Sequence, residues 1–288
     1  MQRTAIGREV YAFLADLGFR TTRGVWPLSP TECDRGPDDD CEMPEHLEWL
    51  LGIQAKGFEI GYHNARVHTS RRQDTIRALE KFRELFGHYP VTMANHFQNG
   101  EGLYWGNERL SGWRRTIYDA ATRGQNRNRF FGHQPDHPLF WGDLAKERIR
   151  YVRNFVFRDV NTLAACPYMP YHDPIKPWVP LWYAATEGNN RDAFVESVRE
   201  ANQDRLEEEG GACLMYTHFG FGYVRDGVLD RRFRELMERL RKKNGWFVPV
   251  STLLDFLRAK HDRDEITPWE RTKLETRWLA TKLRYGTS

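Results

Sequence analysis

The sequence predicts an α/β protein whose parallel strands are joined by crossover helices. Helical patterns alternate with short strand-like runs roughly six times along the chain of 288 residues, with only a few residues between a strand and the next helix. Because 40% of the residues are apolar and 14% are aromatic, the chain can bury a full core. One large α/β domain and two smaller ones both agree with this length.

The first third of the chain contains three predicted helices, each followed by a glycine that is typical of a helix C-cap. Ser70, with Gln73 three residues later, has the pattern of a capping box at the start of the third helix. The predicted helices are 6–17, 44–56 and 70–86, and the strand-like runs are 19–22, 58–62 and 91–94.

The remaining elements are less regular. Residues 104–143 have no clear periodicity, and five prolines predict an irregular loop over 167–180. Strands are expected at 151–157, 212–217 and 246–250, and helices at 190–209, 229–243, 252–260 and after Pro268. We expect one domain over 1–262, with 263–288 as a C-terminal helical extension.

Composition excludes several classes of function. The net charge of +3 is the small difference between 43 basic and 40 acidic residues spread along the chain, which argues against nucleic-acid binding. We expect no transmembrane segment, because the apolar runs are too short to span a bilayer. The chain as given has no signal-peptide pattern, so a cytoplasmic location is expected, although a missing N-terminus would change this. The oligomeric state is not predicted.

The four cysteines are too few and too dispersed for a disulfide framework. Cys33 and Cys41 flank a polar loop whose length allows a disulfide, but reduced loop cysteines are the favoured interpretation.

Four histidines follow predicted strands. His63 and His68 come after the strand 58–62, His96 after 91–94, and His218 after 212–217. Because ligands of parallel α/β folds bind beyond the carboxyl ends of the strands, we expect these side chains to meet at one face. Neutral imidazole binds divalent metal ions, so His63 and His68 are predicted metal ligands.

Each of these residues also has a structural interpretation. His63 and His68 agree with loop histidines that bond to the backbone, although the metal interpretation is favoured. For His218 the two interpretations are balanced, and for His96 the structural one is slightly favoured. Tyr104 and Trp105 are candidates for a wall that stacks on a sugar, but aromatic side chains more often belong to the core.

The run Gly57-Phe58-Glu59-Ile60-Gly61-Tyr62-His63, followed closely by His68-Thr69-Ser70, resembles the second motif of the polysaccharide deacetylases with a NodB-like domain. That motif carries a pair of metal-binding histidines. Three further segments, 14–22, 213–218 and 229–257, are similar to the first helix and second strand, a late histidine motif, and the closing strand and helix of the family. The resemblance covers most of residues 6–260, and only the segment from Glu59 to His68 is specific.

The resemblance implies a distorted (β/α) barrel of the NodB-like type and a metal-dependent hydrolase that removes N- or O-acetyl groups from a carbohydrate. It implies a divalent metal, zinc first and cobalt, manganese or nickel as alternatives, with His63 and His68 as ligands. His218 would be the catalytic acid. His96, Asn99, Tyr104 and Trp105 would lie around the substrate.

The chain departs from the family pattern in three places. The family's first strand ends in an Asp pair that supplies a metal ligand and the base, whereas this chain starts at the helix that should follow that strand. Its two histidines are five residues apart where the family usually has four, and residues 95–99 replace an Arg-Pro-aromatic-Gly motif. The acidic run 38–40 is more simply a solvated loop than a substitute for the pair.

Two explanations of the missing Asp pair stay open. The favoured one is that the natural protein begins further upstream, so that the chain as written lacks its first strand and is impaired. The alternative is a non-catalytic carbohydrate-binding or degenerate deacetylase domain. A third, weaker option is another metal-dependent hydrolase or lyase in which His96 is the third ligand.

Overall fold

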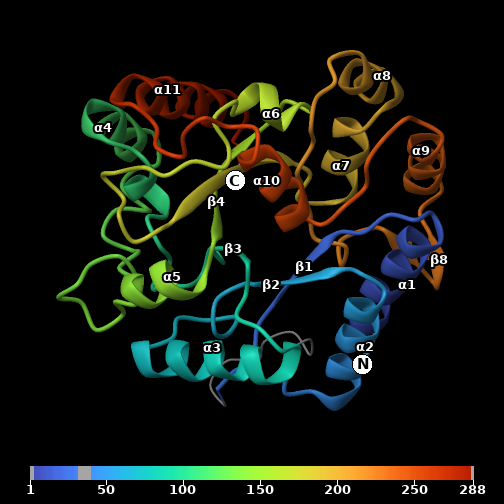
Figure 1. Cartoon of the computed structure of the whole chain (residues 1–288), viewed down its shortest axis with the longest axis horizontal. Coiled ribbons are helices and arrows are strands. Elements are labelled where there is room, and N and C mark those ends of the chain that lie inside the picture. The colour runs from blue at the N-terminus through green and yellow to red at the C-terminus, as the bar shows by residue number, and fades with distance from the viewer. Residues whose placement is uncertain (1–2, 32–39, 287–288) are drawn as a thin grey trace.

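The structure is a computed structural model that describes residues 3–31 and 40–286, with side chains from Gly7 onward. Its centre is a six-stranded sheet in which every neighbouring pair of strands is parallel and the strand order follows the sequence. The sheet curls into an incomplete barrel with helices around it (Figure 1). The predicted α/β class and the distorted (β/α) barrel are therefore confirmed. The strands are β1 Thr22–Val25, β2 Glu59–Tyr62, β3 Thr92–Ala94, β4 Tyr151–Phe157, β5 Leu181–Glu187 and β6 Met215–Tyr216.

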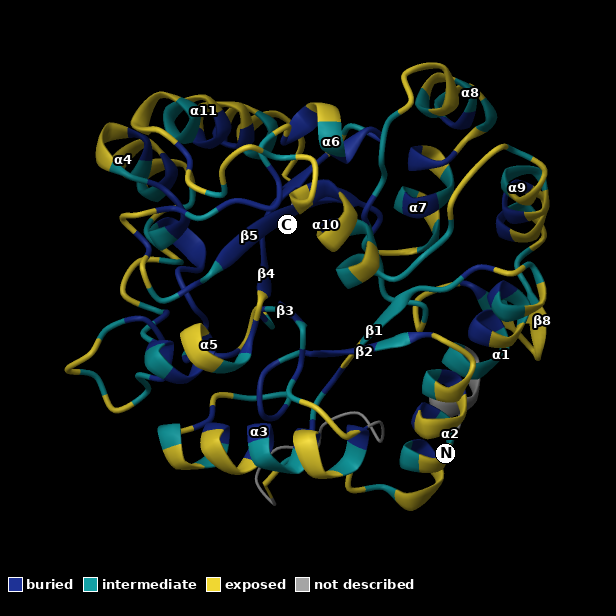
Figure 2. Ribbon diagram, viewed as in Figure 1, coloured by how far each residue is buried: buried dark blue, intermediate teal, exposed yellow. Residues whose placement is uncertain are grey.

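The helices precede, connect and follow the strands, and they cover the outside of the curled sheet. They are α1 Arg3–Asp16, α2 Pro44–Ala55, α3 Arg72–Phe86, η1 Gly106–Arg109 (a 3₁₀ turn), α4 Gly112–Ala121, α5 Gly142–Arg148, α6 Thr162–Ala165, α7 Arg191–Ser197, α8 Glu200–Glu208, α9 Arg231–Arg241, α10 Val250–Arg258 and α11 Pro268–Tyr285. A short hairpin, β7 Val224–Arg225 with β8 Val228–Leu229, follows β6. Figure 2 shows that the helices turn buried faces toward the sheet and exposed faces outward.

Several predicted elements differ from the structure. The segment 246–250 forms no strand, the predicted helix 190–209 is two helices, and Arg71 rather than Ser70 precedes α3, without a side-chain cap. The irregular region 104–143 contains η1, α4 and the start of α5. Strand β5 was not predicted. The loop 167–180 is confirmed as irregular, and β5 begins directly after it.

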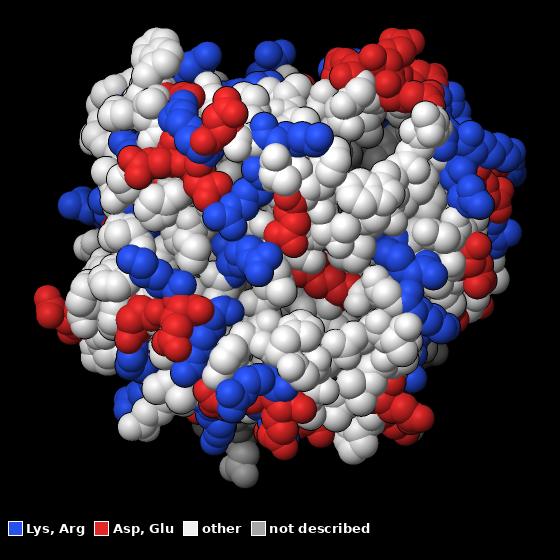
Figure 3. All heavy atoms as spheres, viewed as in Figure 1, with Lys and Arg blue, Asp and Glu red and all other residues white. Residues whose placement is uncertain are grey.

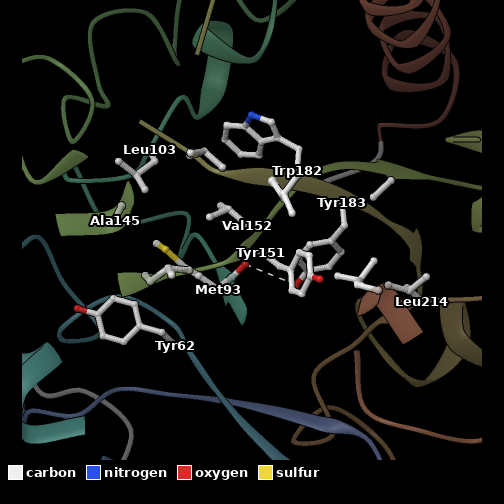
Figure 4. Close-up of a cluster of buried hydrophobic side chains, with 14 of the residues drawn as sticks. Tyr62, Met93, Leu103, Ala145, Tyr151, Val152, Trp182, Tyr183 and Leu214 are labelled. Carbon is white, nitrogen blue, oxygen red and sulfur yellow. Dashed lines mark hydrogen bonds between the residues drawn. The ribbon is translucent and has the colours of Figure 1, made fainter. Parts of the chain in front are cut away.

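The main core lies between the sheet and the helices. Strands β4 and β5 are buried along their whole length, which is typical of the centre of a parallel sheet. Figure 4 shows Met93, Val152 and Trp182 in this core, with a hydrogen bond from the Tyr183 hydroxyl to the Met93 carbonyl over 3.5 Å. A second apolar cluster, centred on Phe233 and Tyr223, lies under α1, α7 and α9.

Glu59 of β2 links the amino-terminal ends of β1 and β3 by hydrogen bonds. Its carboxylate accepts hydrogen bonds from the hydroxyls of Thr22, over 2.6 Å, and Thr92, over 2.8 Å. It also accepts the backbone N–H of Ser251 over 3.1 Å, at the start of α10. The extended segment before α10 runs beside β1, where the Arg20 N–H donates to the Phe247 carbonyl. This segment thus lies along the open edge of β1 without forming a ladder.

Helix α11 is attached to the barrel by buried groups. Trp278 is fully buried against Phe155 of β4 and Tyr118 of α4. Glu275 accepts hydrogen bonds from the N–H and hydroxyl of Ser111 and from Arg114 Nε. The predicted helix after Pro268 is therefore present, whereas the expected domain division at 262/263 stays a prediction.

Among the described helices, none combines the length and apolar character needed to cross a bilayer. On the face shown in Figure 3, basic and acidic side chains are intermixed.

Candidate active site

Three of the four predicted histidines meet beyond the carboxyl ends of the strands. His63 follows β2 directly, and its ring centroid lies 5.0 Å from that of His96, which follows β3. Trp26, directly after β1, contacts both rings at centroid distances of 5.4 Å. His218, two residues beyond β6, is close enough to His63 to lower its pKa. The strand order places these side chains together, because the carboxyl ends of parallel strands share one edge of the sheet.

His63 is held as a neutral base. Its Nδ1 donates a hydrogen bond to the Ala94 carbonyl over 2.7 Å, and a carbonyl can only accept, so the proton is on Nδ1 and Nε2 carries the lone pair. Burial lowers the pKa of His63 well below its usual value, and the nearby His96 lowers it further. The imidazole is therefore an unprotonated acceptor at neutral pH.

His218 has the same tautomer. Its Nδ1 donates to the Asn189 carbonyl over 3.0 Å, and its Nε2 faces the Tyr216 hydroxyl at 3.4 Å. Burial lowers the pKa of His218, against the hydrogen bond to Asn189. It therefore starts as a neutral group, and to act as an acid it must first acquire a proton.

His96 is positioned by two asparagines. Its backbone N–H donates to Asn64 Oδ1 over 2.8 Å, and its Nδ1 lies 2.7 Å from Asn99 Oδ1. Burial lowers the pKa of His96 as well. Asn99 itself is fully buried, and its Nδ2 donates to the carbonyls of Arg66 and His68. Asn99 thus fixes the two loops that carry the histidines.

Glu101 is a buried carboxyl group next to this network that the sequence analysis missed. It is 1% exposed and accepts hydrogen bonds from Asn99 Nδ2 over 2.6 Å and the Ser70 N–H over 3.1 Å. Burial raises the pKa of Glu101 to about 7, against these bonds. It stands in a stretch rich in Gly and Asn, where its burial has no sequence signal.

His68 does not join the other histidines. Its Nε2 accepts the N–H of Thr31 over 3.1 Å, and its Nδ1 donates to the Thr69 carbonyl over 3.1 Å. Both ring nitrogens therefore already have hydrogen-bond partners. Over residues 3–31 and 40–286, no group of three or more His, Cys, Asp or Glu side chains is arranged to hold a metal ion. The His63–His68 metal pair and metal binding itself stay predictions.

The acidic run 38–40 is only partly described. Asp38, Asp39 and Cys33 lie outside the described residues, so the Cys33–Cys41 disulfide remains untested. Asp40 is buried and accepts hydrogen bonds from the Ser29 hydroxyl and the Glu42 N–H. It acts there as a local structural group.

Tyr104 and Trp105 are buried, so neither presents a ring at an open surface. Tyr104 packs on His133 with ring centroids 4.2 Å apart, and Trp105 lies 3.3 Å from the guanidinium of Arg109. The exposed aromatic side chains near the histidines are instead Phe97 and Phe221, each more than half exposed. Each lies within three residues of a site histidine, which is the sequence signal that could have found them.

Two surface clefts are lined by residues outside the histidine cluster. One of about 240 Å³ is lined by Pro167, Tyr168 and the charged segment 260–266, in which Arg263 pairs with Glu270. The histidine cluster is the candidate active site because neutral imidazole side chains lie close together there.

Comparisons with known proteins agree with the fold. No protein-family profile matches the sequence, and no curated protein is significantly similar to it. Among solved structures, a protein from Mycobacterium smegmatis assigned as a polysaccharide deacetylase matches with a TM-score of 0.51 and 15% identity, over 92% of this chain and 80% of that one. The structure of Puue allantoinase matches with a TM-score of 0.50 and 13% identity, over 88% and 72%. The chain therefore has the fold of the deacetylase-like proteins that its Glu59–His68 motif resembles.

Proposed function

We propose that this protein is a hydrolase of the deacetylase type that removes N- or O-acetyl groups from a carbohydrate. The observation that carries the proposal is the convergence of His63, His96 and His218 at the strand ends, with Nδ1 of His63 and His218 held on carbonyl oxygens. The likeness of the fold to a deacetylase and an allantoinase supports it.

In this proposal His63 is the general base. Water attacks the acetyl carbonyl carbon while Nε2 of His63 takes its proton, and the bond to the leaving nitrogen or oxygen then breaks. The leaving group takes up that proton, so acetate and the free amine or alcohol are the products. His218 relays the proton only after receiving it, because its lowered pKa keeps it neutral beforehand.

The proposed mechanism contains no metal-bound step, because the ring nitrogens of His68 are hydrogen-bonded to Thr31 and Thr69. A divalent ion, zinc first and cobalt, manganese or nickel as alternatives, remains a proposal that rests on the family resemblance. Elemental analysis of protein purified without chelator tests it. Metal below about a tenth of an equivalent, unchanged in His63→Ala, would count against it.

Acetate release tests the proposed reaction. We expect the protein to release acetate from acetylated oligosaccharides or p-nitrophenyl acetate, and His63→Gln to lose at least about 100-fold in kcat/KM, the usual contribution of a general base. His88→Gln is the matched control, because His88 is exposed and its Nδ1 also donates to a carbonyl, that of Tyr89. Equal activity of the two variants would contradict the proposal.

A non-catalytic carbohydrate-binding domain is the second candidate. The exposed rings of Phe97 and Phe221 beside the histidines favour it, since aromatic faces stack on sugar rings. In that case oligosaccharide binding persists in His63→Gln and falls in Phe97→Ala and Phe221→Ala, with no acetate released by any variant.

A further inference from the structure

Arg153 is a buried cation inside the curled sheet. It lies in β4 at the point where the register with β5 shifts, and only 6% of the residue is exposed. Register irregularities of this kind redirect side chains and are frequent next to active sites. Its backbone is paired with Ala94, whose carbonyl holds His63. The guanidinium also lowers the pKa of His63 and of His218.

The guanidinium of Arg153 has no anionic partner among the described residues. Over residues 3–31 and 40–286 it makes no hydrogen bond or ion pair, and its Nε is buried without a partner. Its close contacts are with aromatic rings, that of Tyr216 at 4.0 Å and that of Trp105 at 6.0 Å. Buried arginines are normally paired, because an unpaired buried charge is costly.

Two other buried arginines show the usual arrangement. Arg114 is as buried as Arg153, and its Nε donates to Glu275 over 2.8 Å. Arg66 is also buried, and it pairs with Asp74 over 3.0 Å. Arg153 therefore differs from these two arginines, which are buried to a similar extent.

Other charged groups lie near Arg153. Arg109 is a second buried guanidinium within electrostatic reach of Arg153, and Glu187 is the carboxylate whose charge reaches Arg109. Because one face of the Arg153 guanidinium lies on Tyr216, the N–H donors in its plane stay available to a planar acceptor. A carboxylate matches this fork with two parallel hydrogen bonds. A monoanion suits the site better than a phosphate dianion, because Glu187 adds negative charge nearby.

We propose that Arg153 binds a carboxylate of the substrate, so that the site takes an acidic acetylated sugar in preference to a neutral one. This inference rests on the proposed function for the reaction, whereas the binding of the anion can be tested without it. The carboxylate would sit on the Arg153 fork inside the barrel while the acetyl group lies at His63.

The test measures the thermal unfolding midpoint of the whole chain with D-glucuronate, D-glucose or inorganic phosphate at matched ionic strength. We expect glucuronate to raise the Tm of the natural protein by a few degrees at saturation, and glucose to raise it less. Arg153→Gln should lose the glucuronate shift, and Arg153→Lys, which keeps the charge without the fork, should retain part of it.

Stability without ligand separates binding from a structural role. Arg153→Gln should have a Tm equal to or above that of the natural protein, since it removes an unpaired buried charge. The control Arg114→Gln breaks a buried ion pair, so its Tm should fall while its glucuronate shift is retained. A fall in Arg153→Gln as large as that in Arg114→Gln would overturn the proposal.

The ligand outcomes are equally decisive. Equal shifts with glucuronate and glucose, a larger shift with phosphate, or a glucuronate shift that survives in Arg153→Gln would each overturn the carboxylate assignment. An Arg153-dependent shift in a protein that releases no acetate supports anion binding and contradicts only the hydrolytic function. Acetate release without any glucuronate shift supports the hydrolytic function and contradicts carboxylate binding by Arg153.

Discussion

His63 Nδ1 and the Ala94 carbonyl oxygen are 2.7 Å apart, so the end of β3 sets the tautomer of the residue that follows β2. The bond turns Nε2 of His63 away from the β3 backbone as the basic nitrogen. Strand pairing therefore positions the proposed proton acceptor, since any change in the register of β2 and β3 would move His63.

The pH dependence of the proposed acetate release follows from this arrangement. Burial lowers the pKa of His63, so the base stays neutral, and active, at pH values where a free histidine would be protonated. We expect the acidic limb of the kcat/KM profile to lie well below pH 6.5. A limb at or above pH 6.5 that is unchanged in His218→Gln would contradict the role of His63.

Glu101→Gln should affect stability differently at acidic and alkaline pH. Burial raises the pKa of Glu101 from 4.5 to about 7 in the folded protein, so the folded state binds more protons than the unfolded state between these values. The contribution of Glu101 is therefore full below about pH 4.5 and is lost as the pH rises through 7. Relative to the natural protein, Glu101→Gln should gain unfolding free energy from pH 5 to pH 8 in urea titrations.

The exposed Glu238 provides the control for this measurement. Glu238→Gln should show the same difference from the natural protein at both pH values. A cost of Glu101→Gln that stays constant or grows toward pH 8 would show that its carboxyl group is ionised throughout.

Two substitutions at Asn64 separate its backbone role from its side-chain role. Asn64 has a φ of 68°, and its side chain accepts from the His96 N–H and donates to Glu101. Alanine and glycine both remove these hydrogen bonds, but only alanine is strained in the left-handed region. We expect Asn64→Ala to be less stable than Asn64→Gly by about 1 kcal/mol in urea unfolding. Equal stabilities of Asn64→Ala and Asn64→Gly would contradict this prediction. A loss of activity in both variants would indicate that the Asn64 side chain positions His96.

Glu275→Ala should strongly destabilise the protein. Glu275 is fully buried, and its loss would leave Arg114 without its carboxylate partner and remove the acceptor for Ser111. The expected loss is about 3–5 kcal/mol of unfolding free energy. Glu235→Ala removes the exposed pair with Arg231 and should cost no more than about 1 kcal/mol. A loss in Glu275→Ala as small as that of Glu235→Ala would mean that α11 is not part of the cooperative fold.

The meeting of His63, His96 and His218 was predictable from the sequence, because it depends only on parallel strands ending at one edge. The orientation of His68 was not, since its partner Thr31 is 37 residues away and nothing local specifies the contact. Strand β5 was missed because Leu181–Glu187 contains two alanines and a glutamate, which disfavour strands, and burial on both faces removes any alternation.

For the segment 246–250, a strand was predicted that the structure does not contain. Its aromatic and β-branched residues predict a strand, but the Arg20 N–H to Phe247 carbonyl bond does not extend into a ladder. Arg153 had a usable signal, because a basic residue within the apolar run Tyr151–Phe157 is unusual for a buried strand.

The contact of the segment before α10 with β1 has a consequence for folding. The Val250 N–H donates to the Thr22 hydroxyl over 2.9 Å, across a separation of 228 residues. Bringing such distant residues together costs loop entropy before any contact compensates for it, so we expect this junction to form late. Once formed, the junction joins β1 to the segment before α10. A substitution that loosens one of these segments should therefore also destabilise the other.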